Sequence, residues 1–387
     1  MNPSPKTLRI LFVTPVSPFS WAAGSEQRSS LMLSALARLG RVDVLQLSHG
    51  DFTQVTSENA EGRRVVLAQV GGDRLALSPY RPKLFLTRDI ERALGCTMSD
   101  FQLIVGRYVW PVCQLAIPDV VPVIVDLDDF RYRYSLESPW SWSSAKQRLT
   151  KAITHRLVLR QLKRFDGAFT VSAQDAREVV GLPTALLSNV SVCTCLIPSP
   201  VPQSKNILFV GSLWYGPNVD GINWFLAHVW PRVRVNEPEA TLTLVGAASQ
   251  SARARWQIHP GVSAPGFVVN LAAVYEQANL VVVPIQSGGG TNIKVLEAMA
   301  HGRPCLVSSF VAKAFAGLLK AEKEMLVARN KNEFSVEILK ALKTPKLLQN
   351  VANAGHFAAG KHFAPALFES TAVQFIQTTL LKNARAT

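Results

Sequence analysis

Short apolar runs alternate along the chain with longer stretches whose apolar residues recur at helical spacing. The run LRILFVTPV at 8–16 predicts a buried strand, and 25–40 predicts a helix that ends at Gly40, a natural C-cap. Strands that alternate with helices in this way are typical of parallel α/β layers. Further strands are expected at 41–47, 101–106, 121–129 and 167–172.

The pattern restarts after a proline-rich segment. Residues 196–205 read LIPSPVPQSK, a composition that marks a linker, and the tetrapeptide ILFV occurs both at 10–13 and at 207–210. We therefore expect an α/β protein of two doubly wound, Rossmann-like lobes that face each other across a cleft. The sequence leaves open the lobe on which the final helix packs. The predicted limits are a first lobe at 1–195, a linker at 196–205, a second lobe at 206–362 and a final helix at 363–387.

A glycine-rich loop follows the apolar run NLVVVPI at 279–285 and leads into a predicted helix. Ligands of doubly wound folds bind at the carboxyl ends of the strands, so this loop is a candidate site. Lys294 lies in the first helical turn, where the macrodipole and the unpaired N–H groups favour an anion over a cation. A bound diphosphate would explain this lysine, because it would meet the N–H groups, the dipole and the ammonium together. The loop residues expected to contact it are Gly288, Gly289, Gly290, Thr291 and Asn292, of which either of the last two can cap the helix.

Glu297 follows Lys294 by one helical turn. It lies about 4.5 Å farther along the axis and on the same face. A carboxylate there is well placed to accept hydrogen bonds from the vicinal hydroxyls of a ribose. The predicted ligand is therefore a nucleoside diphosphate. The alternative is that Lys294 and Glu297 form an ordinary surface ion pair, worth about 0.3 kcal/mol.

The segment GGGTNIKVLEAMAHGRPCLVSS at 288–309 resembles the donor-binding segment of the GT-B glycosyltransferases of group 1 (family 4). The similarity extends more loosely over most of the chain. It implies that Glu297 binds the donor ribose and that the protein transfers a sugar from a nucleotide donor, usually with retention of anomeric configuration. It further implies a saccharide or lipid-linked acceptor, a part in polysaccharide or glycoconjugate synthesis, and no metal or cofactor besides the donor.

Two departures from the family's pattern bear on catalysis. Gly289 stands where the family commonly has a first glutamate, which holds a sugar hydroxyl. The stretch 211–221, GSLWYGPNVDG, has no Arg or Lys where the family often has a basic pair. Lys294 is therefore the expected cation on the diphosphate and a predicted catalytic residue, and Gly211 is assigned to donor binding.

The loop after the first strand offers a second set of candidates. Gly24, at the start of a predicted helix, resembles part of the family's glycine-rich first loop and is assigned to the donor. Arg28, one turn later, is expected to contact donor or acceptor. The alternative for this stretch is a merely structural tight turn.

Aspartates end the strand at 121–129. Asp128 is the nearest match to a histidine that the family often places near the acceptor, and its carboxylate is a candidate general base. Asp126 and Asp129 are assigned to the acceptor side. Loop aspartates that cap the next helix are the alternative. A metal-binding D-x-D motif is a weaker interpretation, because two residues carry little specificity.

Charge adds a candidate partner surface. The chain has 41 Lys and Arg against 27 Asp and Glu, a net charge of +14, which favours a polyanion such as nucleic acid or acidic lipid. Residues 140–165 combine Trp140 and Trp142 with a basic amphipathic stretch, which favours an anionic membrane surface. A solvated helix face that packs its leucines on the core is the alternative. Nucleic acid is not expected, because aromatic residues do not interleave with basic ones on a recognisable binding module.

Five scattered cysteines without zinc spacing fit a reducing compartment, and the sequence has no run of about 18 apolar residues. We expect a cytoplasmic enzyme, peripheral on the inner face of the cytoplasmic membrane. The alternatives are a nucleotide-sugar epimerase on the same scaffold and a non-catalytic protein that binds an anionic polymer. A nicotinamide or flavin oxidoreductase is disfavoured, since no G-x-G-x-x-G follows the first strand.

Overall fold

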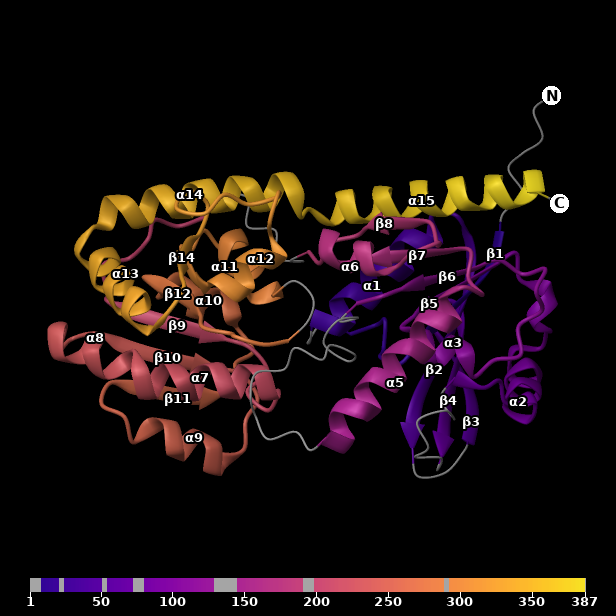
Figure 1. Cartoon of the computed structure of the whole chain (residues 1–387), viewed down its shortest axis with the longest axis horizontal. Coiled ribbons are helices and arrows are strands. Elements are labelled where there is room, and N and C mark those ends of the chain that lie inside the picture. The colour runs from indigo at the N-terminus through magenta and orange to yellow at the C-terminus, as the bar shows by residue number, and fades with distance from the viewer. Residues whose placement is uncertain are drawn as a thin grey trace. The chain divides into compact units, whose positions relative to one another are not determined.

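The protein forms two compact units (Figure 1). The first is Met1–Ser188 together with Pro365–Thr387, and the second is Asn189–Ala364. The boundary thus falls before the proline-rich segment that the composition marked as the linker. The computed structural model describes residues 8–20, 24–50, 54–71, 80–128, 145–190, 198–288 and 292–386.

The first unit is built on one sheet with the strand order β3-β4-β2-β1-β5-β6-β7-β8. Neighbouring strands are parallel except β3 and β4, which are antiparallel. The apolar pattern did not predict β3, because its side chains are mostly polar and exposed at the sheet edge. The strands are β1 (Leu8–Thr14), β2 (Gly40–Gly50), β3 (Gln54–Ala60), β4 (Arg63–Gly71), β5 (Leu103–Arg107), β6 (Val123–Asp126), β7 (Gly167–Thr170) and β8 (Thr184–Leu186).

Gly40 differs from its predicted role. It does not cap the first helix but begins β2, where it pairs with Leu8 of β1. A Cβ atom at Gly40 would lie 2.0 Å from the Leu8 carbonyl oxygen, so only glycine permits this approach of the two strands.

Helices cover the first sheet, and one of them comes from the other end of the chain. Figure 1 shows the final helix α15 (Pro365–Ala386), in yellow, lying along this unit. Its buried residues Phe368, Ala372 and Ile376 recur every four positions, the stripe of a helix packed on one face. The other helices of the unit are α1 (Gly24–Ala37), α2 (Leu84–Leu94), the 3₁₀ helix η2 (Met98–Asp100), α3 (Val109–Cys113), α5 (Ala145–Leu162) and α6 (Ala173–Glu178).

Polar contacts fix α15 at both ends. Ser34 of α1 donates a hydrogen bond to Glu369 at 2.6 Å, and Asn383 donates one to Asp166, which precedes β7, also at 2.6 Å. The sequence left open where this helix packs. Its contacts in the structure lie with α1 and β8 of the first unit.

The second unit has a wholly parallel sheet with the order β11-β10-β9-β12-β13-β14. Its strands are β9 (Asn206–Val210), β10 (Thr241–Val245), β11 (Val262–Gly266), β12 (Leu280–Val283), β13 (Cys305–Ser308) and β14 (Leu326–Ala328). Its helices are α7 (Gly216–His228), α8 (Trp230–Asn236), α9 (Gln250–Gln257), α10 (Leu271–Glu276), α11 (Ile293–Ala300), α12 (Ser309–Ala314), α13 (Lys331–Lys343) and α14 (Pro345–His362).

Among the parallel strands of each sheet the order reverses once, and the reversal marks where a ligand would bind. In the first sheet β1 lies between β2 and β5, and in the second β9 lies between β10 and β12. The connections after the two strands that meet at the reversal run to opposite faces of the sheet, so a crevice is expected between their loops. The expected position of a ligand in each unit is therefore beside the strand that carries the repeated ILFV tetrapeptide.

The proline-rich segment is held firmly in the second unit where it is described. Arg303 is 1% exposed and donates hydrogen bonds to the carbonyl oxygens of Ser199 at 2.7 Å and Pro200 at 3.1 Å. Next to it, a Cβ atom at Gly302 would lie 2.2 Å from Cβ of Pro198. Composition predicted a linker here, but residues 199–200 accept hydrogen bonds from Arg303, which follows α11. Among the described helices, none combines the length and the apolar character needed to cross a membrane.

Candidate functional site

Glycines bring three loops together at the carboxyl edge of the second sheet. Gly211 follows β9, Gly246 follows β10 and Gly288 follows β12. A Cβ atom at Gly246 would lie 1.8 Å from the carbonyl oxygen of Gly211, and Gly246 and Gly288 have φ angles of 145° and 125°. Only glycine adopts such angles readily. The edge is therefore lined by main chain that a ligand can approach closely.

Lys294 lies on this edge, in the first turn of α11. Its ammonium donates a hydrogen bond to Oδ1 of Asn292 at 3.1 Å and lies 5.8 Å from the centre of the Phe209 ring. A Cβ atom at Gly211 would lie 3.1 Å from Cε of Lys294, so a larger residue there would crowd the lysine stem. Asn292 holds the N-cap position, yet its side chain makes no capping hydrogen bond. The positive end of the α11 dipole and the Lys294 ammonium thus lie together, which is an arrangement that suits a bound anion.

Glu297 is oriented by a neighbour that the sequence did not single out. The hydroxyl of Tyr275, in α10, donates a hydrogen bond to Oε2 of Glu297 at 3.3 Å. Tyr275 is fully buried, and its ring stacks on His301 with centroids 4.5 Å apart. Burial, helped by the charge of Arg303, lowers the pKa of His301 below its ordinary value. The imidazole is therefore neutral at pH 7, and its stacking holds the tyrosine in place.

Five of the predicted donor residues lie in the described part of the second unit: Gly211, Gly288, Asn292, Lys294 and Glu297. All belong to the loops after β9 and β12 or to α11, on the two sides of the reversal in strand order. The predicted residues Gly289, Gly290 and Thr291, and Asp129 of the first unit, lie outside the described residues.

The first unit has a buried network of charges at the matching edge of its sheet. Arg28, in α1, donates two hydrogen bonds to Asp126 at the end of β6, with N–O distances of 2.7 and 2.6 Å. The side chains are 1% and 0% exposed. Arg28 and Asp126 were expected to touch donor or acceptor, but the structure directs them to each other beneath the surface. Burial alone would lower the pKa of Arg28, and the carboxylate of Asp126 outweighs it, so the pKa is raised.

Arg107 completes this network and was missed by the sequence analysis. It is the last residue of β5, fully buried, and its guanidinium binds Asp128 and lies 3.6 Å from Asp126. It also donates to the hydroxyl of Ser29 at 2.8 Å. The available signal was one arginine at the end of the otherwise apolar run LIVGR, on the strand beside the reversal in strand order.

Asp128 is the most exposed of the four charges, at 9% of its side chain. It is therefore the network's candidate for contact with a substrate, whereas Asp126 serves to hold the two guanidinium groups. Gly24, assigned to the donor, is the first residue of α1. Within the described residues, no three His, Cys, Asp or Glu side chains are grouped in a way that could hold a metal ion.

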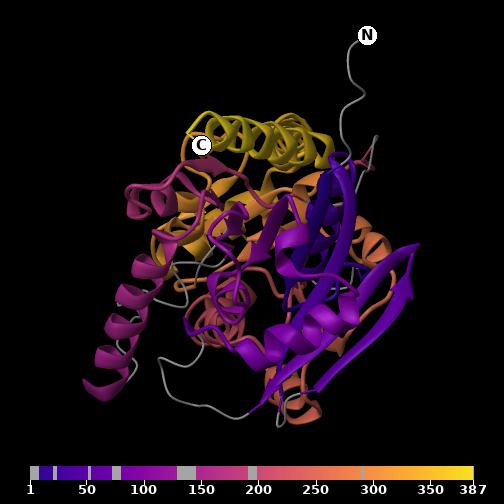
Figure 2. The same cartoon turned by 90° about the vertical axis from the view of Figure 1, so that its right-hand side faces the viewer.

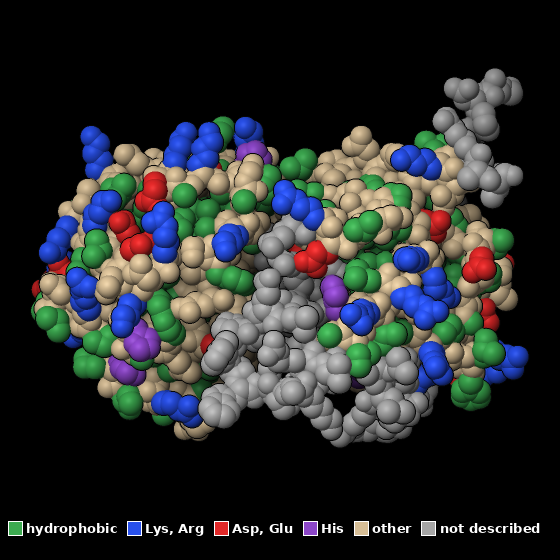
Figure 3. Space-filling view, in the orientation of Figure 1, with side chains coloured by type: hydrophobic (Ala, Val, Ile, Leu, Met, Phe, Trp, Pro, Cys, Tyr) green, Lys and Arg blue, Asp and Glu red, His purple; other side chains and the backbone are tan. Residues whose placement is uncertain are grey.

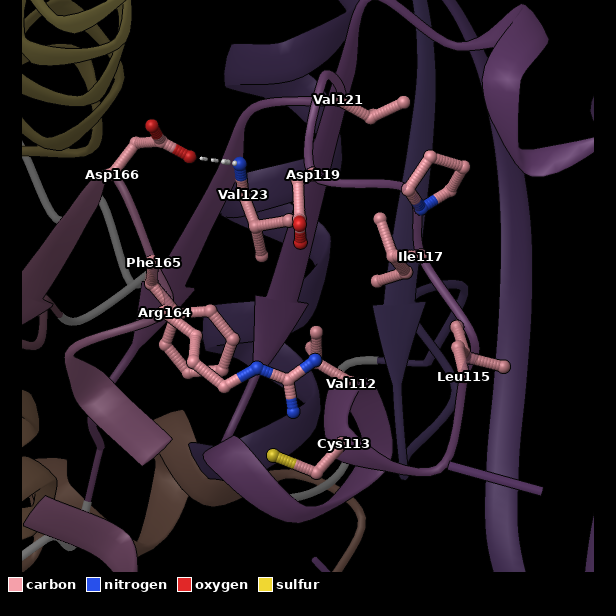
Figure 4. A pocket seen from close by; sticks show the side chains of 11 residues that line it. Val112, Cys113, Leu115, Ile117, Asp119, Val121, Val123, Arg164, Phe165 and Asp166 are labelled. Carbon is pink, nitrogen blue, oxygen red and sulfur yellow. Dashed lines mark hydrogen bonds between the residues drawn. The ribbon is translucent and has the colours of Figure 1, made fainter. Parts of the chain in front are cut away.

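A separate pocket of about 230 Å³ lies at the opposite edge of the first sheet (Figure 4). Its lining includes Val123, which begins β6, and Asp166, which precedes β7 and accepts a hydrogen bond from the Val123 amide at 2.7 Å. Ligands of doubly wound sheets bind at the carboxyl ends of strands, so this pocket does not match the predicted site. Cys113 also lines it, and burial raises the pKa of this thiol to about 12, which leaves it protonated and unreactive.

Comparison with known proteins finds a family model that matches much of the second unit. Residues 204–344 match the family model described as "Glycosyl transferases group 1". An uncharacterized 44.6 kDa protein in the cps region of Klebsiella pneumoniae is 26% identical over 175 residues. These residues are 43% of this chain and 44% of that protein, so the chain matches less than half of the length of that relative.

Solved structures extend the likeness to both units. A sucrose-phosphate synthase from Thermosynechococcus elongatus has a TM-score of 0.70 at 18% identity. The match covers 98% of this chain and 100% of the synthase. HepE from Anabaena, solved in complex with UDP, has a TM-score of 0.63 at 15% identity over 96% of this chain and 100% of its own. TarM has a TM-score of 0.57 at 10% identity. That match covers 70% of this chain and 54% of TarM. At these identities the likeness shows the fold alone, and the predicted GT-B fold class is confirmed.

Proposed function

We propose that the chain, whose residues 204–344 match the family model of the group 1 glycosyltransferases, transfers a sugar from a nucleoside-diphosphate sugar to a saccharide or lipid-linked acceptor. The observation that carries the proposal is the grouping of Lys294, Glu297 and the uncapped first turn of α11 beside Gly211. One end of this group suits a diphosphate and the other, one helical turn away, suits a ribose. HepE, which shares the fold, was solved with UDP, a ligand of the same class.

The reaction joins an acceptor hydroxyl oxygen to the anomeric carbon and breaks the bond from that carbon to the diphosphate. The departing nucleoside diphosphate takes the bonding electrons, and the Lys294 ammonium and the dipole of α11 would stabilise its added negative charge. Asp128 is our candidate to accept the hydroxyl proton. Because the chain itself supplies positive charge to the diphosphate, we propose transfer without a metal ion. Retention of anomeric configuration is proposed from the family resemblance.

Glu297→Gln is expected to weaken UDP binding about 10- to 100-fold, because it removes the charge from the acceptor of the ribose hydrogen bonds. Isothermal titration with UDP measures the change. Glu239→Gln is the matched control, since Glu239 is a 79% exposed carboxylate of the same unit, paired with Lys205, and should leave affinity unchanged. Equal affinities in both variants and in the wild type would remove Glu297 from the site.

A panel of nucleotide sugars tests the proposal as a whole. A bound donor raises the melting temperature by mass action, so the correct base and sugar will be the ones that shift it most. Transfer of labelled sugar from that donor to an acceptor is the decisive assay. Conversion of the donor to its epimer in the absence of an acceptor would overturn the transferase assignment.

We propose further that helix α5 docks the protein on an anionic membrane, at the inner face of the cytoplasmic membrane. Figure 2 shows α5, in magenta, projecting from the first unit. Val158 and Leu162 on one side are buried, whereas Ile153 is 42% exposed. Figure 3 shows Lys and Arg side chains spread over the face that it draws, so net charge alone marks no docking surface. The exposed side of α5 and the turn after it carry Ile153, Arg156, Arg160, Lys163 and Arg164.

The double variant Arg156→Ala/Arg160→Ala is expected to bind vesicles of acidic phospholipid about 10- to 30-fold more weakly at low salt. Each basic residue near such a surface contributes about 1 kcal/mol. Vesicle co-sedimentation measures the binding. The control Arg81→Ala/Arg88→Ala removes the same charge from exposed positions of the same unit. If both double variants lose binding equally, or the wild type does not sediment, docking through α5 is wrong.

A further inference from the structure

We propose that the second unit has a separate binding site for an anionic saccharide, in a pocket between α7, α12 and α13. The pocket measures about 440 Å³ and follows the carboxyl ends of β12, β13 and β14. Its size is that of sites that bury a small ligand. The residues that carry the argument are Trp224, Phe310, Phe334, Gln286, Arg329 and Lys331, all of which line the pocket.

Aromatic rings form one wall. The ring of Trp224, half-buried, meets Phe334 edge to face, with centroids 5.6 Å apart and planes at 73°. Phe334 is itself buried, so the indole is fixed in position. Phe310, at the start of α12, is 38% exposed beside the same pocket. Aromatic faces carry partial negative charge and attract polarised C–H groups, which the apolar faces of a sugar ring present.

Cations form the rim. Arg329 and Lys331 flank the cap of α13, and no Asp or Glu is among the described residues that line the pocket. Arg329 makes only a loose ion pair with Glu333 at 3.7 Å, and its side chain is 79% exposed, so it is available to a ligand. A guanidinium binds a carboxylate through two parallel hydrogen bonds. The exposed amide of Gln286 can accept and donate hydrogen bonds to hydroxyl groups. This combination fits a saccharide that bears a carboxylate.

The pocket is distinct from the candidate donor site. In the sheet order, the glycine-bearing loops follow β9, β10 and β12, whereas the pocket extends from the loop after β12 toward β14. The loop after β12 contributes to both sites through different residues. Gln286 lines the pocket, whereas Gly288 belongs to the candidate donor site. The inference rests on the pocket's own residues and does not depend on the proposed transfer reaction.

The test uses the full chain and a short probe, trigalacturonic acid, with maltotriose as its neutral counterpart. Binding is measured by isothermal titration at about 0.15 M salt, where charges more than about 8 Å apart are largely screened. Wild-type protein is expected to bind the acidic trisaccharide and not the neutral one. Arg329→Ala/Lys331→Ala is expected to lower that affinity about tenfold or more, because hydrogen bonds to charged groups are lost. Gln286→Ala should lower it by a smaller factor.

The matched control is Lys346→Ala/Lys361→Ala, which removes the same charge from exposed positions on α14. It should leave trigalacturonate affinity unchanged. An equal loss of affinity in both double variants would show general attraction to a basic protein and would overturn the site. Equal binding of maltotriose and trigalacturonic acid, or no binding of trigalacturonic acid by the wild type, would also overturn it. UDP titration of each variant separates this test from the proposed function, since the pocket variants should bind UDP as the wild type does.

Discussion

Lys294→Ala is expected to lower kcat for sugar transfer about 100- to 1000-fold, the loss typical of removing one group that stabilises charge in the transition state. The ammonium is held in place by Asn292 at 3.1 Å, and its stem passes over Gly211. The stretch 211–221 supplies no Arg or Lys that could share this role. KM for the donor should change less than kcat, since the charge on the leaving diphosphate grows as the bond breaks. Steady-state release of nucleoside diphosphate measures both.

Lys313→Ala is the control for this prediction. Lys313 is an exposed cation in α12 of the same unit, and it has no part in the donor site. Its removal should leave kcat within about twofold, a difference below 0.5 kcal/mol. A Lys294→Ala enzyme with unchanged kcat would place the charge stabilisation elsewhere.

Asp126→Asn is expected to destabilise the first unit by about 3–5 kcal/mol, the usual cost of removing one partner from a buried ion pair. The carboxylate is 0% exposed, accepts both hydrogen bonds of Arg28 and lies 3.6 Å from Arg107. Without its charge, the two buried guanidinium groups of the network face one carboxylate, Asp128, in place of two. Urea unfolding followed by circular dichroism gives the free energy of unfolding. The unfolding transition of the first unit should shift to lower urea concentration.

Asp43→Asn provides the comparison. Asp43 is also buried in a strand of the first sheet, with its side chain 1% exposed, but its partners Arg9 and Arg41 are 29% and 67% exposed. These guanidinium groups can return to water when the carboxylate is neutralised, so the cost should be clearly smaller. If Asp126→Asn costs no more than Asp43→Asn, the buried network does not hold the unit together.

The strands β1, β2, β5, β6, β7 and β12 could be predicted because their apolar runs are largely buried and contain few polar residues. The parallel strands β4 and β8 of the first sheet were not predicted. The edge strand β3 could not be predicted, since an exposed and polar strand owes its conformation to pairing with β4. The packing of α15 was equally out of reach. Its stripe of Phe368, Ala372 and Ile376 shows that one face is covered, but nothing local states by what.

The candidate site divides in the same way. Lys294 and Glu297 could be found because the features that mark them are neighbours in the sequence: a glycine-rich loop, a helix start and a spacing of one turn. Tyr275 and Arg107 could not, because each acts through a partner 22 and 21 positions away in the chain, Glu297 and Asp128 respectively. Arg28 and Asp126 were noticed as charges near a helix start and a strand end, yet their separation of 98 positions hid the fact that they neutralise each other.

The position of α15 has a consequence for biosynthesis. The first unit is assembled from residues at opposite ends of the chain, so the surface of α1 that receives Phe368 and Glu369 stays uncovered while the ribosome makes the second unit. Domains usually fold in the order in which they emerge. Here the first unit must wait for α15, which is translated after the second unit, before this surface is covered.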